Sequence, residues 1–149
     1  MNEVVVLQVL GFETDYLNLL KMLVAVFVGF FIGLNRQKHI VGSRTFSLIC
    51  LGATIFTFVS LIHLPGFEDS TGPMRVIAQI VSGIGFLGLG VVWKYKEKIG
   101  GLTTAATIWL VASIGVLIGL TMWPEAIVAT VLAKLILMSR EPSSGNNDQ

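Results

Sequence analysis

The sequence is poor in charged residues, cysteine and histidine, and each shortage narrows what the protein can be. Only 13% of its 149 residues are charged, while 54% are hydrophobic. Soluble domains carry about 25% charged residues, so this is not the composition of one. The single cysteine, Cys50, excludes an internal disulfide. The net charge of +1 gives no basis for binding nucleic acid.

Acidic residues are missing from most of the apolar sequence. Asp and Glu are absent from positions 16–67 and 70–96, and Glu125 stands alone between positions 98 and 140. Mg²⁺ and Ca²⁺ prefer oxygen ligands that usually include carboxylates, and proton relays inside membranes usually use acids or histidine. We therefore expect no carboxylate-lined cation path and no metal site. The sequence suggests no nucleophile–base pair, so we expect neither an enzyme nor a cofactor.

Five apolar runs, separated by short polar segments, make up most of the chain. Four of them reach the ~17–25 residues that a helix needs to cross ~30 Å of hydrocarbon. They lack the alternation of strands, and a backbone in lipid must form helices or a closed barrel. The fifth run has only 15 residues and contains Lys134. We predict an all-α membrane bundle of about five helices, at residues 17–34, 45–64, 76–93, 102–122 and 124–138.

The placement of charge predicts the orientation of this bundle. Basic residues, including Arg36, Arg44 and Lys94, gather in the loops after the first and third runs, and acidic residues flank the opposite ends. Because cytoplasmic loops collect Lys and Arg, the N-terminus should lie outside and the C-terminus inside. We expect residues 1–140 to form the membrane domain and residues 141–149 a disordered tail.

The first two runs align with the next two at a shift of 58 residues (94 minus 36). Arg36 then coincides with Lys94, and Thr45 with Thr103. A parallel repeat about the membrane normal would give these matches. The shared demand for basic residues and a glycine in inner loops would give them too, and the sequence leaves both explanations open.

Glycines recur inside the runs at helical spacing. Residues 83–88 formally match the dinucleotide-binding fingerprint, which functions only between a strand and the start of a helix. No strand precedes it here, so we reject that interpretation. Small residues instead let helices approach closely or bend. We interpret the following as helix-packing positions: Gly29, Gly33, Gly83, Gly85, Gly88, Gly90, Gly115 and Gly119.

Polar side chains inside the runs are few, and burying them without a partner is costly. In the second run Ser47, Cys50, Thr54 and Thr57 share one helical face. The interpretation we favour is that these hydroxyls bond to carbonyls of their own helix, while their small side chains permit close packing. Gln79 is the stronger functional candidate, since an amide has four hydrogen-bonding capacities and needs a specific partner.

Three basic residues lie within the runs or at their edges. Lys21, Arg75 and Lys134 are each close enough to the end of a run to reach the membrane surface. We expect all three to be interfacial anchors rather than members of a relay.

Three stretches resemble motifs of the MgtC/SapB family. Residues 42–53 read GSRTFSLICLGA, like that family's G-x-R-T followed by L-V-C-L-G-A. Residues 75–88, RVIAQIVSGIGFLG, match its R-x-x-A-Q-I-V-S-G-I-G-F-L-G almost letter for letter. Residues 101–109, GLTTAATIW, are similar to its G-L-T-T-A-A-T-x-W. The resemblance covers about residues 21–120 and identifies the chain as a short form, the transmembrane domain only.

The resemblance implies a multi-pass protein of the bacterial inner membrane, tied to survival in low Mg²⁺ and, in pathogens, within host cells. Some members are labelled Mg²⁺ transporters, and others look like regulators of membrane partners such as the F-type ATP synthase. The acid-free interior favours the second activity: a non-enzymatic protein that aids adaptation to low magnesium or acid stress through a membrane partner. We also expect the chain to form homo-oligomers through its glycine-rich helices. The family's positions carry over here as candidate functional residues Arg36, Arg44, Thr45, Arg75, Gln79, Ser82, Thr103, Thr104, Thr107 and Trp109.

Two other functions remain open. A small transporter for Mg²⁺ or another ion or solute would use a path lined by Gln79, Thr103, Thr104 and Thr107. A lipid-binding scaffold would use the two basic loops, because each basic residue near an anionic surface contributes about 1 kcal/mol.

The sequence departs from the family pattern in two places. Where the family usually reads G-L-E-R-E, residues 33–37 read GLNRQ, so Asn35 and Gln37 replace two acids. The family also tends to place an Asp just ahead of Arg75, where this sequence begins its turn with Gly72. A metal site that depends on those acids is not expected here. Many relatives also carry a soluble C-terminal domain, and regulation housed there is expected to be missing.

Overall fold

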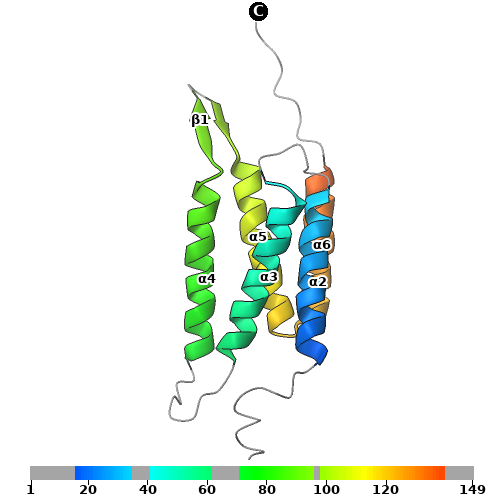
Figure 1. Ribbon diagram of the computed structural model, residues 1–149. Helices are drawn as coiled ribbons and strands as arrows, with labels where there is room; N and C mark the ends of the chain where they lie inside the picture. The colour runs from blue at the N-terminus through cyan, green and yellow to red at the C-terminus, as the bar shows by residue number, and fades with distance from the viewer. Residues whose placement is uncertain (1–15, 35–40, 62–70, 96–97, 140–149) are drawn as a thin grey trace, which may run out of the picture.

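The computed structural model describes residues 16–34, 41–61, 71–95 and 98–139. Within these ranges the chain forms five α-helices and one small antiparallel β-hairpin (Figure 1). In chain order the elements are α2 (Tyr16–Gly33), α3 (Ser43–Ser60), α4 (Gly72–Leu89), β1 (Trp93–Tyr95), β2 (Lys98–Gly100), α5 (Leu102–Gly119) and α6 (Trp123–Met138).

The helices confirm the predicted all-α membrane bundle. Four of them, α2 to α5, have 18 residues each and are apolar enough to cross a membrane. At about 1.5 Å per residue each spans about 27 Å, close to the ~30 Å of a hydrocarbon core. The fifth helix, α6, has 16 residues and begins with Pro124 in its first turn, where the missing N–H of proline costs nothing.

The bundle has a middle and two flanks. In Figure 1, α3 and α5 lie between α4 on one side and the pair α2 and α6 on the other. One end of the bundle carries the C-terminal end of α2, the start of α3, the hairpin and the C-terminal end of α6. We call it the inner end, because charge placement predicts that it faces the cytoplasm.

The third run ends differently from its prediction of 76–93. Helix α4 begins four residues earlier, at Gly72, and ends at Leu89. Its last turn tightens through bonds from Val91 N–H to the Gly88 carbonyl and from Val92 N–H to the Leu89 carbonyl. The chain then enters the hairpin, whose register pairs Trp93 with Gly100. Strands of three residues are too short to be recognised by their hydropathy, and the hairpin was not predicted.

Glycines bring the backbones of α2, α3 and α5 together. A Cβ at Gly29 would lie 2.6 Å from the Cα of Ser47, and one at Gly119 would lie 2.6 Å from the Cβ of Thr57. Gly33 and Gly115 are equally close to α3. Only glycine permits such contacts, and they let apolar side chains such as Phe46 become fully buried. The core of the molecule therefore lies between these three helices.

Several expectations concern residues outside the described ranges. These expectations concern Asn35, Arg36 and Gln37, and the segment 141–149. The orientation of the bundle in the membrane, the internal repeat and the domain limits also remain predictions.

Candidate functional site

Helix α4, which carries the longest motif, is the least buried helix of those that can cross a membrane. Only 6% of its residues are buried, against 28%, 39% and 50% for α2, α3 and α5. Gly88 alone is buried among its 18 residues, all of which are described. A lipid environment accepts the exposed side chains of Phe86 and Leu89. It does not accept the exposed polar side chains of Gln79 and Ser82 as readily.

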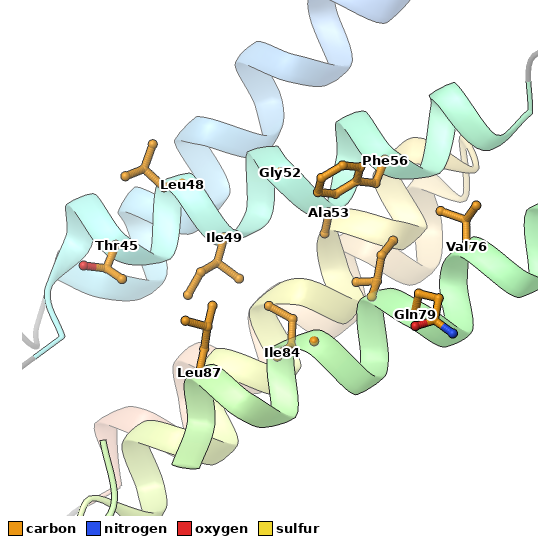
Figure 2. Close-up of a pocket in the computed structure, with 12 residues that line it drawn as sticks. Thr45, Leu48, Ile49, Gly52, Ala53, Phe56, Val76, Gln79, Ile84 and Leu87 are labelled. Atoms are coloured by element: carbon orange, nitrogen blue, oxygen red, sulfur yellow. The ribbon is translucent and has the colours of Figure 1, made fainter. Parts of the chain in front are cut away.

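A groove of about 580 Å³ separates α4 from α3 (Figure 2). Thr45 lies at its inner end, and Val76, Gln79 and Phe56 lie toward its other end. Apart from Thr45 and Gln79, its walls are apolar side chains and two glycines. Its lining residues are Thr45, Leu48, Ile49, Gly52, Ala53, Phe56, Val76, Gln79, Ile80, Gly83, Ile84 and Leu87.

Gln79 lies in the half of α4 away from the inner end, seven residues or about 10 Å from the start of the helix. Its side chain is exposed at the edge of the groove. Among the described residues the structure shows no hydrogen-bond partner for its amide. An amide without a hydrogen-bond partner in hydrocarbon costs about 4–8 kcal/mol. The position of Gln79 therefore calls for a partner outside the described chain.

The polar face predicted on the second run belongs to the core. The Thr54 hydroxyl lies 2.9 Å from the carbonyls of both Cys50, on its own helix, and Gly115 on α5. The Ser47 hydroxyl donates to the Val26 carbonyl of α2 at 3.0 Å. The Thr57 hydroxyl donates within α3. These hydroxyls hold helices together rather than line a path, and two of them reach beyond their own helix.

The α5 threonines lie at the inner end of the bundle. Thr104 and Thr107 are buried, and the Thr107 hydroxyl donates to the Thr103 carbonyl at 2.6 Å. This part of α5 adjoins the end of α4, where a Cβ at Gly88 would lie 3.7 Å from the Cβ of Ala105. Gln79 lies nine residues before Gly88, about 13 Å along the helix. The structure does not bring Gln79 and the threonines together.

The remaining candidates are dispersed. Trp109 lines a separate cavity of about 250 Å³ between α4 and α5, together with Ser113. Arg44 is exposed in the first turn of α3, and Arg75 is exposed in the first turn of α4, at opposite ends of the bundle. Ser82 is exposed on α4, one turn from Gln79. The described candidates therefore form no single site: four lie on α4 or along its groove, and four lie on α5.

Lys21 is not the interfacial anchor that its position predicts. Its side chain is only 6% exposed, and its ammonium group donates to the Gly119 carbonyl at 3.3 Å. Gly119 is the last residue of α5, and the end of a helix offers unpaired carbonyls and partial negative charge. At the inner end, Lys134 donates to the Phe31 carbonyl of α2 at 2.8 Å and lies 4.6 Å from the centre of the Phe31 ring. The hydropathy of a sequence does not indicate which backbone carbonyls will lie beside a lysine in the folded bundle.

Metal ligands do not cluster in the described ranges. Nowhere among those residues do three or more His, Cys, Asp or Glu side chains come together. Cys50, which is buried in α3, forms no disulfide.

Comparisons with known proteins agree on one family. A sequence model described as the MgtC family matches residues 22–145. Protein MgtC of Salmonella typhimurium (strain LT2) is 44% identical over 116 residues, which are 76% of this chain and 48% of the relative. Protein MgtC of Brucella abortus is 46% identical over 110 residues, 72% of this chain and 44% of the relative. An uncharacterized Synechocystis protein is 36% identical over 129 residues, 85% of this chain and 53% of its own length.

These relatives are longer than the chain. It spans about half the length of the curated relatives that it matches. No solved structure matches it.

Proposed function

Since the chain belongs to the MgtC family and is a multi-pass protein of the bacterial inner membrane, we propose that it is a non-enzymatic protein that supports adaptation to low magnesium or acid stress by binding a membrane partner. The observation that carries this proposal is the exposed face of α4, formed by Ala78, Ser82, Gly85, Phe86 and Leu89. It lies on the helix that holds the longest family motif.

Small residues make this face suitable for a second helix. A Cβ at Gly85 would meet nothing within 4 Å. A glycine inside a helix costs about 1 kcal/mol relative to alanine, and within the described chain Gly85 receives no packing in return. A partner helix that approaches its backbone closely would supply that packing. Gly85 thus supports an intermolecular contact, in contrast to the glycines of α2 and α5.

Gln79 would add specificity to the contact. In hydrocarbon an amide gains from a partner that offers both a donor and an acceptor. The F-type ATP synthase is the first candidate partner to examine, since some members of the family look like regulators of it. Self-association through α4 would cover the same face, and the experiment below separates the two.

The transporter alternative has weaker support. The groove beside Gln79 has almost entirely apolar walls. The α5 threonines that the path requires lie near the inner end, away from Gln79. Ions would pay a large dehydration cost in such a groove.

A growth and co-purification experiment tests the proposal. A bacterial strain that lacks the protein would be complemented with the unaltered chain, with Gly85→Leu, or with the control Val128→Leu on the exposed side of α6. We expect Gly85→Leu to insert at a normal level but to lose growth in low Mg²⁺ and to lose a membrane protein that the other two retain. If Gly85→Leu keeps both, or if the unaltered chain purifies only with copies of itself, the proposal is wrong.

A further inference from the structure

We propose that the α3–α4 groove binds one acyl chain of an anionic phospholipid of the inner leaflet, with the headgroup at Arg44. This inference goes beyond the proposed function, because it concerns the groove rather than the exposed face of α4. The proposal rests on the length of the groove, its apolar walls and the charge at its inner end.

The groove has the length of a lipid leaflet. It extends from Thr45 to Phe56 on α3 and from Leu87 to Val76 on α4. Eleven residues of either helix correspond to about 16 Å. Half of a hydrocarbon core of ~30 Å is about 15 Å. One acyl chain that enters from the inner surface would therefore run along most of the groove.

The volume of the groove is that of a site for a small apolar ligand. The groove holds about 580 Å³, within the range of small-ligand sites. Its floor includes Gly52 and Gly83, and a Cβ at either would meet nothing within 4 Å. A flexible hydrocarbon chain fills such a space without displacing α4.

Charge at the inner end selects an anionic headgroup. Arg44 is exposed and directly precedes Thr45, the residue at the inner end of the groove. Lys94 is exposed on the hairpin at the same end of the bundle. Glu125, the one acidic residue in the described ranges, starts α6 at the opposite end. A basic side chain near a membrane surface attracts anionic lipid.

Lipid retention measured by native mass spectrometry tests this assignment. The purified chain would be reconstituted in equal parts of phosphatidylglycerol and phosphatidylcholine, and the lipids that stay bound would be counted. We expect one phosphatidylglycerol per chain, retained over phosphatidylcholine. Arg44→Gln should lower that preference about fivefold. Arg75→Gln, at the far end of α4, should leave it unchanged.

A second variant tests the groove itself. Gly52→Leu places a side chain in the open groove without a clash elsewhere, so it should fold and release the bound lipid of either type. Equal retention of the two lipids by the unaltered chain would overturn the proposal, as would a phosphatidylglycerol that stays bound to Gly52→Leu. A disulfide between two copies of Gly52→Cys would instead show a second copy in the groove, and it would also overturn the proposal.

Discussion

Two sets of glycines in helices of equal length have opposite surroundings. Gly29 on α2 and Gly115 on α5 lie so close to α3 that any Cβ there would collide with its backbone. Gly83 and Gly85 on α4 face open space. The first set joins α2, α3 and α5 into a core, whereas the second leaves α4 attached along one side only. On α2 and α5 glycine thus joins helices inside the molecule, whereas on α4 it leaves the backbone open to the surroundings.

Alanine substitutions should affect the two sets with opposite signs, and the difference of about 2–4 kcal/mol between them is the largest expected effect. Gly29→Ala places a methyl group 2.6 Å from the Ser47 Cα, and overpacking of this kind costs about 1–3 kcal/mol. Gly85→Ala should instead stabilise by up to about 1 kcal/mol, because alanine favours the helix. Unfolding in mixed micelles with increasing sodium dodecyl sulfate, followed by circular dichroism, measures both. Equal effects of the two substitutions would show that the glycines of α2 and α4 do not differ in how closely they are packed.

Lys21→Met should be the next largest loss. It removes the bond from the buried ammonium to the Gly119 carbonyl, and hydrogen bonds to charged groups are worth about 1.5–3 kcal/mol. The matched control is Lys134→Met, which removes a similar bond to the Phe31 carbonyl near the inner surface. Water can replace that bond, so the control should lose less free energy of unfolding. A larger loss for the control would show that the bond of Lys21 to Gly119 contributes less to stability than the bond of Lys134 to Phe31.

Thr54→Val should weaken the core by a smaller amount. The Thr54 hydroxyl reaches the Gly115 carbonyl of α5, and hydrogen bonds between membrane helices average about 0.6 kcal/mol. Thr57→Val is the control, since that hydroxyl donates only to Ala53 of its own helix. The same unfolding measurement should show a clear difference between the two. If both variants unfold alike, the bond between α3 and α5 contributes nothing.

Much of the fold follows from hydropathy and charge. A helix that crosses lipid must be long and apolar, so hydropathy predicts all five helices. The bounds of the first and last predicted runs differ from those of α2 and α6 by one residue. The predicted third run lies four residues later than α4 at both ends. Its predicted end is too late because the apolar sequence continues through Val91 and Val92 into β1. Hydropathy reports that these valines are apolar but does not report the turn at the end of α4. The hairpin depends on pairing between strands, which no single run reveals.

The candidate site was less accessible to sequence reasoning. The prediction that Ser47 and Thr54 lie on one face could be made from helical spacing, yet their bonds to α2 and α5 depend on the neighbours of that face. The burial of Lys21 likewise depends on where α5 ends. The groove beside Gln79 arises from how loosely α4 packs, a property of the tertiary arrangement. The longest motif match points to α4 but does not indicate which face of that helix is exposed.

Gln79→Leu should have the smallest effect on stability and a large effect on function. The side chain is exposed and forms no bond to another described residue, so leucine removes no bond within the chain and should not lower the free energy of unfolding. Loss of the co-purified partner would agree with an intermolecular role for the amide. Flux through reconstituted vesicles that this substitution abolishes would favour the transporter instead.

Photo-crosslinking in native membranes tests most directly whether α4 presents the working surface. A photoreactive amino acid would be placed at Ser82 on α4 and, as a control, at Phe27, which is 68% exposed on α2. We expect a discrete adduct with another membrane protein from position 82 and only lipid adducts from position 27. Lipid adducts alone from both positions would contradict the account.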